Sequence, residues 1–436
     1  MANHDENPSF RPSRVAAPSR RALLRSGLAT LGGVALGGPA ALAEGGAGNP
    51  ANQPPNIPDW SRYLGEGVAV RAYGRPSEHE ANVIRRDVEW LTASKESSVS
   101  FTPLHALDGP ITPNGLCFER HHAGIAEVDP ADYRLILHGL VEKPLVFTLD
   151  DLKRMPRVNR AHFCECAANS GMEWRGAQLD GCQFTHGMVH SVMYTAVPLK
   201  MLLDEAGLKP GAKWLLVEGG DAAAMTRSLP LQKALEDTLV AYRMNGEMLR
   251  PENGYPVRLV IPGWEANMWI KWLRRIEVGD EPWHHREETS KYTDLLEGGR
   301  ARRFTYVMDA KSVITSPSPQ APLNHRRGFT VLSGLAWSGR GKVARVDVSL
   351  DGGRNWRPAR LDGPVWDRAL TRFYYEFDWD GGELLLQSRA IDESGYVQPT
   401  KAELRKLRGV NSIYHNNGIQ TWQVHRSGEV ENVEVS

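Results

Sequence analysis

Apolar and polar positions alternate in short blocks from about residue 130 onward, and these blocks predict short strands and short helices. Residues 133–141, YRLILHGLV, alternate apolar and polar side chains, which is typical of a half-buried strand. Residues 144–156, PLVFTLDDLKRMP, predict a strand followed by a helix that begins at Thr148 or Asp150 and ends before Pro156. Strands and helices therefore follow one another closely in this part of the chain.

The same mixture continues to about residue 290. Residues 196–208 predict an amphipathic helix closed by Gly207, and residues 231–239 predict another helix. Residues 255–263, YPVRLVIPG, form an apolar run that is typical of a buried strand. This mixture indicates the α+β fold class, with a mixed α/β domain over residues 101–300.

Beyond about residue 300 the pattern changes to strands at regular spacing. Strand patterning separated by Gly and Asp turns covers residues 328–339, 342–361, 372–381 and 383–399. Asp351-Gly352-Gly353 predicts a hairpin turn, and residues 314–322, ITSPSPQAP, predict a linker into this part. The regular spacing predicts an immunoglobulin-like β-sandwich over residues 301–436.

The N-terminal residues carry the pattern of an export signal. Arg20-Arg21 precede a mildly apolar, Gly/Ala-rich run that ends at the small residues Ala41-Leu42-Ala43. This predicts a twin-arginine signal peptide over residues 1–43 and a periplasmic location, because the glycines and the short apolar core argue against a membrane helix. Residues 44–100 are expected to form a leader and N-terminal extension, in which residues 77–96 show a charged helical pattern.

The net charge and the export signal bear on the partners and the cofactor that are expected. The chain has 52 Lys and Arg against 52 Asp and Glu, so its net charge of zero gives no support to nucleic-acid or polyanion binding. Neither a nucleic-acid partner nor a stable membrane span is expected. Twin-arginine export carries folded proteins, which favours a cofactor that is loaded before export.

The four cysteines leave several chemistries open. Cys164 and Cys166 lie too close to pair comfortably with each other, and Cys117 and Cys182 show no spacing code. No CxxC or CxxCH sequence is present, so neither a zinc ribbon nor covalent haem attachment is indicated. Residues 162–171, HFCECAANSG, are compatible with disulfide bonding, a soft metal ligand, a nucleophile or plain packing.

Residues 114–124, NGLCFERHHAG, offer a cation beside two histidines. Arg120 provides a rigid fork for an oxyanion. Because adjacent residues of a strand face opposite sides, at most one of His121 and His122 is expected to share a site with Arg120. A solvated surface cluster is the alternative.

Two further cations, Arg258 and Lys271, lie within apolar runs. Buried cations need anionic partners, which either a ligand or structural salt bridges would supply. Asp221 lies in a Gly-rich turn, either as a turn residue or as a hydrogen-bond acceptor for a ligand. Tyr292 offers a proton or hydrogen-bond donor, with a half-buried surface tyrosine as the alternative.

The order and spacing of these segments resemble the sulfite oxidase family. FERHH, ECAANSG, VEGGD, AYRMNGEMLRPENGYPVRLVIPG and IKWLRRIEV are similar to the molybdopterin core of that family. DAKSVITSPSP and VDVSLDGGRNWRPARL resemble its C-terminal dimerisation domain. The resemblance covers roughly residues 100–436. It implies a molybdenum cofactor bound through molybdopterin and homodimerisation through the C-terminal domain, and the lack of CxxCH implies no haem on this chain.

The resemblance also implies roles for single residues. Cys166 matches the thiolate ligand of molybdenum, whereas Cys164 matches no ligand and is expected to pack. Arg120 and Tyr292 match residues of the reaction centre. The residues that match cofactor-binding positions are Phe118, Arg120, His122, Asp221, Asn253, Arg258 and Lys271, and Asn253 stands where sulfite oxidases usually have histidine.

One departure from the family concerns the substrate. Ser170 and Gly171 stand where sulfite oxidases usually have two arginines, which predicts a wider, less cationic pocket suited to sulfur carried on a protein. The twin-arginine signal, ECAANSGMEW and ETSKYTDLL look most like the sulfane dehydrogenase branch of the family. This likeness implies oxidation of sulfane sulfur on a sulfur-carrier protein in thiosulfate oxidation, with electrons passed to a c-type cytochrome subunit.

Three alternatives stay open at the level of sequence. One is a sulfite:cytochrome c dehydrogenase that acts on free sulfite. Another is a reductase of sulfoxides or nitrate on the same scaffold, which the direction of electron flow would separate. The last is a non-catalytic secreted binding protein, which would have no molybdenum to lose in a Cys166→Ala variant.

Overall fold

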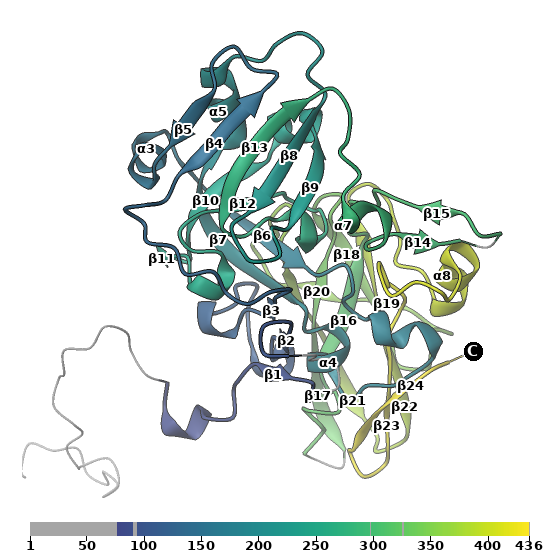
Figure 1. The fold of residues 1–436 in the computed structure, drawn as a ribbon. Helices are drawn as coiled ribbons and strands as arrows, with labels where there is room; N and C mark the ends of the chain where they lie inside the picture. Colours follow the sequence, from purple (N-terminus) through teal and green to yellow (C-terminus); the bar gives the residue numbers. More distant parts are fainter. Residues whose placement is uncertain (1–75, 90–93, 297, 325–326, 436) are drawn as a thin grey trace, which may run out of the picture. The chain divides into compact units, whose positions relative to one another are not determined.

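The computed structural model describes residues 76–89, 94–296, 298–324 and 327–435 (Figure 1). The predicted signal peptide over residues 1–43 and the leader as far as residue 75 lie outside the described residues. Residues 76–101 contain the 3-10 helix η4 (Glu78–Glu80) and the strands β1 (Arg86–Asp87) and β2 (Val99–Phe101). The helix predicted over 77–96 is therefore wrong for the residues described there. η4 buries no residue, so no apolar face stabilises a longer helix.

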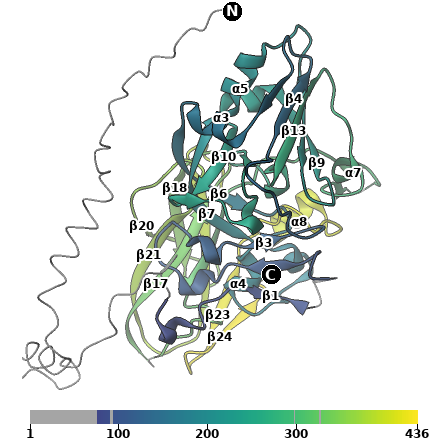
Figure 2. The ribbon, with the colours of Figure 1, turned by 60° about the vertical axis from the view of Figure 1, so that its left-hand side comes forward.

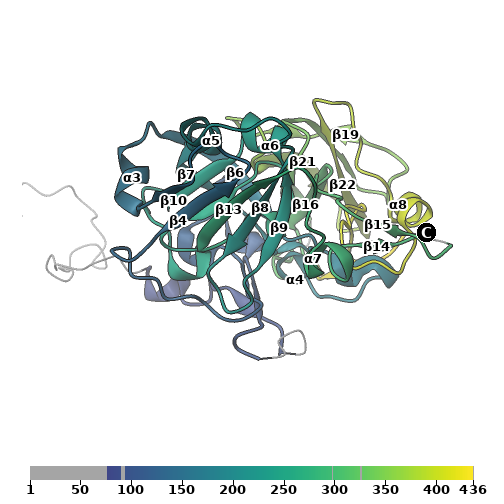
Figure 3. The ribbon, with the colours of Figure 1, turned by 45° about the horizontal axis from the view of Figure 1, so that its top comes forward.

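One sheet of the N-terminal part has the strand order β5-β4-β13-β8-β9, and Figure 3 shows its last four strands side by side. β4 and β13 pair in parallel, and all other neighbours pair antiparallel. The strands are β4 (Leu135–Gly139), β5 (Leu145–Phe147), β8 (Trp214–Gly219), β9 (Thr226–Pro230) and β13 (Leu273–Gly279).

A further sheet has the order β11-β10-β7-β6, with β12 paired to β10. It consists of β6 (Val158–Glu165), β7 (Val189–Pro198), β10 (Leu239–Met244), β11 (Glu247–Met248) and β12 (Arg258–Val260). β12 is buried at every position, which confirms the buried strand predicted within residues 255–263.

The helices that were predicted in this part are confirmed. α3 (Leu149–Arg154) begins after Thr148, whose side chain accepts a hydrogen bond from the Asp151 backbone N–H while the Asp151 side chain accepts from the Thr148 N–H. α5 (Leu199–Ala206) buries its leucines and ends at Gly207, where a φ of 73° favours glycine. Within the described residues of this part, the other α-helices are α4 (Cys182–His186), α6 (Leu231–Glu236) and α7 (Arg286–Thr289).

The C-terminal part consists of two antiparallel sheets, ordered β16-β17-β21-β20 and β19-β18-β22-β23-β24. Figure 2 shows β20, β21 and β17 side by side in the first of them. The strands are β16 (Lys311–Ser316), β17 (Gly328–Trp337), β18 (Val343–Ser349), β19 (Arg357–Pro358), β20 (Arg360–Leu361), β21 (Thr371–Trp379), β22 (Leu384–Asp392), β23 (Thr421–Val424) and β24 (Val430–Val433). Apolar residues of both sheets share one core, as in a sandwich.

Two predictions for the C-terminal part need correction. Residues 314–316 belong to strand β16 and pair with β17, so the linker predicted over 314–322 begins too early. Val313 and Ile314 are buried, and this burial outweighs the turn signal of the prolines that follow. The helix α8 (Lys401–Arg408) was not predicted, although Thr400 caps its start and Gly409 ends it.

The two parts share packing as well as sequence. The core of the C-terminal part includes Leu104, Phe163, Cys182 and Val189 from the N-terminal part. The end of β6 and the start of β7 are thereby fixed against the C-terminal sheets. Among the described residues, no helix combines the length and apolar character needed to span a membrane.

Candidate active site

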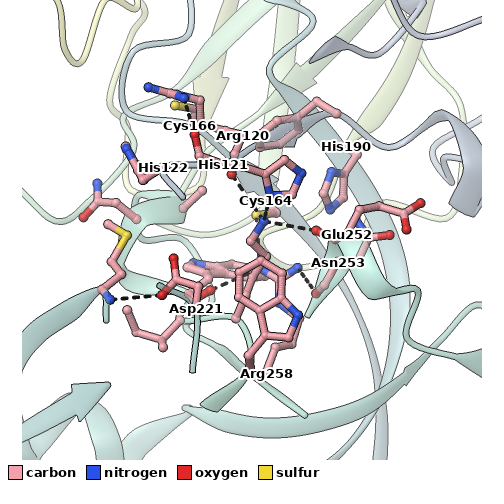
Figure 4. Close-up of a pocket in the computed structure, with 18 of the residues that line it drawn as sticks. Arg120, His121, His122, Cys164, Cys166, His190, Asp221, Glu252, Asn253 and Arg258 are labelled. Atoms are coloured by element: carbon pink, nitrogen blue, oxygen red, sulfur yellow. Dashed lines mark hydrogen bonds between the residues drawn. The ribbon is translucent and has the colours of Figure 1, made fainter. Parts of the chain in front are cut away.

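A pocket in the N-terminal part gathers side chains from segments that lie far apart in the sequence (Figure 4). They come from the end of β3 (Glu119–Arg120), the turn after β6, the start of β7, the turn after β8, the short helix η9 (Pro251–Asn253), β12, the residues before β13 and the loop after α7. All nine residues predicted at the site line this pocket, namely Phe118, Arg120, His122, Cys166, Asp221, Asn253, Arg258, Lys271 and Tyr292.

Arg258 is a buried cation without a carboxylate partner among the described residues. Its Nη1 donates to the carbonyl of Asn253 at 3.1 Å, and its Nη2 donates to the carbonyl of Trp269 at 3.3 Å. The guanidinium also lies over the rings of Tyr194 and Trp269, 5.9 and 5.8 Å from their centroids. These neutral contacts orient the side chain and leave its charge uncompensated.

Lys271 is a second cation of the pocket without a carboxylate partner among the described residues, and it is partly buried. Its Nζ donates to the carbonyls of Arg120 and Glu252 at 3.2 and 3.0 Å and lies 3.0 Å from His121 Nδ1. Burial, together with the charge of Arg258, lowers the pKa of Lys271 to about 7. An anion in the pocket would favour the charged lysine and reverse this shift.

The turn that carries these contacts requires a glycine. Gly254 has a φ of 103°, and a Cβ at this position would lie 3.0 Å from the Cβ of Lys271 and 3.2 Å from the Cβ of Arg258. Glycine therefore allows η9 to approach both cations closely.

Both histidines after Arg120 line the pocket, which corrects the expectation that at most one would do so. β3 ends at Arg120, so the alternation of a strand does not apply to the next two residues. Burial lowers the pKa of His121 to about 3, so the ring is neutral near pH 7. Because His121 Nδ1 accepts from Lys271, its Nε2 carries the proton and donates to Glu119 at 2.8 Å.

Cys166 stands directly after β6 and is 9% exposed. Its backbone N–H donates to the carbonyl of Met188 at 3.0 Å, and burial raises the pKa of its thiol. Cys164 is buried as predicted and also lines the pocket, with its Sγ 3.9 Å from Nη2 of Arg258. All four cysteines of the chain are free and buried, so the disulfide alternative is wrong in this structure.

A phenol and an imidazole meet at the side of the pocket formed by the loop after α7. The hydroxyl of Tyr292 lies 3.1 Å from Nε2 of His122. Burial raises the pKa of Tyr292 and, together with the charge of Arg120, lowers the pKa of His122 to about 4. At neutral pH both groups are uncharged, so the Tyr292 hydroxyl can donate a hydrogen bond to the ring. The ring of Tyr414 from the C-terminal part lies 5.1 Å from that of Tyr292.

The pocket includes residues that the sequence did not single out. His190 lies opposite Cys164 in the pairing of β6 with β7, and its Nδ1 has no hydrogen-bond partner among the described residues. Asn267, in the short helix η10 (Ala266–Met268), is also unpartnered at both side-chain atoms. Strand register would have revealed His190, but a strand's partner cannot be read from one sequence.

The predicted role of Ser170 and Gly171 is not supported by their positions. Neither residue lines the pocket. The Ser170 hydroxyl donates to the carbonyl of Thr185 at 2.7 Å, and a Cβ on Gly171 would lie 2.4 Å from the carbonyl oxygen of Ile413. Gly171 is therefore explained by close backbone packing rather than by the width of the pocket.

The donor set of the pocket fits an anionic cofactor with heterocyclic groups and a metal. Arg120, Arg258 and Lys271 form no ion pair among the described residues and would compensate an anionic group. The unpartnered polar atoms of Asn253, Asn267 and His190 would bind the ring system. Cys164 and Cys166 both line the pocket, and Cys166 would ligate a soft or high-valent metal as a thiolate.

Comparisons with known proteins agree with this reading of the pocket. Residues 122–287 match the family described as oxidoreductase molybdopterin binding domain, and residues 302–422 match the Mo-co oxidoreductase dimerisation domain. The chain is 33% identical to sulfite oxidase of Gallus gallus over 330 residues, covering 69% of this chain and 71% of that protein. It is 31% identical to the mitochondrial sulfite oxidase of Rattus norvegicus, of which it spans 61%.

A solved structure is more similar still. The sulfane dehydrogenase SoxCD from Paracoccus pantotrophus matches with a TM-score of 0.86 and 60% identity, over 87% of this chain and 98% of that chain. Fold, pocket and relatives together define a molybdenum oxidoreductase with a molybdopterin-binding domain and a C-terminal dimerisation domain. The chain belongs to the sulfite oxidase family.

Proposed function

We propose that this chain oxidises sulfane sulfur carried on a partner protein and passes the electrons to a c-type cytochrome. The observation that carries the proposal is the convergence of three cations without ion pairs and the buried thiols of Cys164 and Cys166 in a single pocket. The 60% identity to a chain of sulfane dehydrogenase supports the sulfur substrate and the cytochrome partner. Export by the twin-arginine pathway to the periplasm belongs to the same proposal and rests on Arg20-Arg21.

The cations have the first task, which is to hold the cofactor. Arg258 and Lys271 would bind its phosphate. Both donate hydrogen bonds only to neutral acceptors, so no side chain compensates their positive charge. Asp221 and Asn253 would accept or donate hydrogen bonds at the pterin ring. Phe118, whose ring lies 5.0 Å from that of His190, would form an apolar wall beside it.

Cys166 has the second task, which is to ligate the metal. Burial keeps the free thiol protonated, so ligation releases a proton and leaves a thiolate. When bound, the molybdenum cofactor supplies oxygen-atom transfer and two-electron redox chemistry. Arg120, which also lines the pocket, would attract an anionic sulfur group toward the metal.

Tyr292 and His122 have the third task, which concerns protons. The phenol stays protonated at neutral pH and the imidazole stays neutral, so the pair can donate a hydrogen bond to a substrate oxygen.

Free sulfite is the second candidate substrate, because relatives at 31% and 33% identity are sulfite oxidases. Ser170 and Gly171 no longer decide between the two, since neither lines the pocket. The preference for a carried sulfane therefore rests on the greater identity to the sulfane dehydrogenase chain.

The test compares electron yield and rate on two substrates, using molybdenum-replete protein with a c-type cytochrome as acceptor. A persulfide-loaded carrier protein should support fast turnover with several electrons per sulfur, while free sulfite should be a poor substrate. Fast sulfite turnover with an inert carrier would move the assignment to sulfite dehydrogenase. Cys166→Ala is the control for electrons that do not come from the pocket.

A further inference from the structure

The segment that follows β6 is held from two sides. We define residues 166–171 as the cysteine loop. On the side that faces the N-terminal part, the Cys166 N–H donates to the carbonyl of Met188 at 3.0 Å. Within the loop, the Asn169 N–H donates to the carbonyl of Cys166 at 2.9 Å. Asn169 Oδ1 accepts from the Met188 N–H at 3.1 Å. These contacts all come from the N-terminal part.

The opposite side of the cysteine loop is bound by the C-terminal part. The His415 N–H donates to the carbonyl of Ala167 at 2.8 Å. Asn416 Nδ2 donates to the carbonyl of Ser170 at 3.0 Å, and Gly171 packs directly against the backbone of Ile413. Residues 413–416 therefore follow the cysteine loop along most of its length.

A buried ion pair joins the two parts next to the thiol. Lys311, the first residue of β16, donates to Glu165 Oε1 at 3.0 Å, and the two side chains are 2% and 0% exposed. Asn169 Nδ2 donates to the same oxygen at 2.9 Å, and Trp337 Nε1 donates to Oε2 at 2.7 Å. Lys311 also donates to the carbonyl of Asn169 at 3.2 Å. Both carboxylate oxygens of Glu165 are thus satisfied.

The pair lies behind the pocket rather than in it. Neither Lys311 nor Glu165 lines the pocket, whereas Cys166 directly follows Glu165 in the chain. Replacing a buried ion pair by an apolar pair of the same size is often neutral or stabilising, so stability alone does not explain this pair. The pair instead fixes the orientation of the Glu165 side chain, because each donor binds one defined carboxylate oxygen. The end of β6 is thereby held in place.

We propose that Lys311 and Trp337 of the C-terminal part are positioning residues that hold the cysteine loop through Glu165 and so fix the Cys166 thiol toward the pocket. The C-terminal part then completes the active site of its own chain, in addition to any role in dimerisation. The inference goes beyond the proposed function, because it concerns the loop that carries the thiol whichever sulfur compound is oxidised.

The molecule offers a matched control for this proposal. Lys401 of α8 pairs with Glu173 at 3.2 Å, with side chains 9% and 1% exposed. This is also a buried Lys–Glu pair between the same two parts, but Glu173 lies outside the cysteine loop, in η8 (Gly171–Arg175). Lys401→Met thus repeats the loss of a buried charge without touching Glu165.

The experiment measures alkylation of each cysteine in the full-length chain, as isolated, by iodoacetamide and peptide mass mapping. Lys311→Met should raise the labelling rate of Cys166 by about tenfold through local opening, while Cys182 stays unlabelled. Lys401→Met should leave Cys166 at the wild-type rate, and Lys311→Arg should restore most of the protection.

A double variant keeps the test decisive if Lys311→Met alone does not fold. Lys311→Met combined with Glu165→Gln removes both buried charges and retains side chains of similar size. It should fold and still expose Cys166 to labelling. Equal labelling of Cys166 in the Lys311 and Lys401 variants, or a rise at Cys182 that matches the rise at Cys166, would overturn the proposal.

Discussion

Lys271, which is partly buried, and Lys311, which is fully buried, meet opposite surroundings. Lys271 donates to two carbonyls and a neutral imidazole, and it has no ion-pair partner among the described residues. Lys311 donates to the carboxylate of Glu165 and to one carbonyl. Burial lowers the pKa of both lysines, and Glu165 opposes this shift at Lys311. The first lysine lines the pocket, and the second lies in the layer behind it.

The presence or absence of an ion-pair partner distinguishes cations that stabilise the fold from cations that are available to bind a ligand. A buried charge that is paired with another side chain contributes to the fold. A cation in a pocket without such a partner indicates a site for an anionic ligand. Arg258 follows Lys271 in this respect. Arg227 follows Lys311, because it lies 3.3 Å from Glu265 and 3.5 Å from Glu288, and all three side chains are almost fully buried.

The largest expected effect is on the stability of the cofactor-free chain. Lys311→Met leaves Glu165 charged and unpaired, which should lower the free energy of unfolding by about 3–5 kcal/mol. Lys271→Met removes a charge that has no partner, so at pH 7 it should lower the free energy of unfolding by much less than Lys311→Met does. Denaturant unfolding of the two variants measures this. Equal losses would show that the two lysines do not differ as described.

A second prediction applies the same comparison to two tyrosines. Tyr292 lines the pocket and contacts His122, whereas Tyr414 packs against the ring of Tyr292. If the Tyr292–His122 pair handles protons, Tyr292→Phe should lower kcat by about a hundredfold while stability stays nearly unchanged. Tyr414→Phe is the control and should retain most activity. Similar kcat values for Tyr292→Phe and the wild type would exclude this role.

A third prediction concerns pH. The pKa of Lys271 is about 7 in the folded chain, against an ordinary value of 10.5. Between these values the unfolded chain holds a proton that the folded chain lacks, so the contribution of Lys271 to stability rises with pH and is lowest below pH 7. The stability difference between wild type and Lys271→Met in the cofactor-free state should follow this rise from pH 7 to pH 9. A flat difference would mean that Lys271 keeps its charge without a ligand.

Much of the fold could be predicted from local pattern. The helix after Thr148 and the helix closed by Gly207 have caps and apolar spacing that a single sequence displays. The β16 strand was missed at residues 314–316, because its burial depends on partners that the sequence does not name. The helix α8 was missed although its capping residue Thr400 is visible, since the whole of residues 301–436 was interpreted as a β-sandwich.

Less of the site than of the fold could be predicted from the sequence. Spacing alone left Arg120, Cys166 and Lys271 with several interpretations, and the family resemblance brought them together before the structure did. His190 and Asn267 depend on strand register and on the path of a loop, which one sequence does not determine. The misinterpretation of Gly171 has the same origin, because its constraint is the backbone of Ile413, 242 positions away in the sequence.

The most direct test of the central claim is the molybdenum content of purified protein from molybdenum-replete cells. Cys164 and Cys166 line the same pocket two residues apart, so each is the control for the other. The account predicts stoichiometric molybdenum in the wild type and in Cys164→Ala, and loss of most of it in Cys166→Ala. Wild-type molybdenum in Cys166→Ala, or its loss only in Cys164→Ala, would contradict the account.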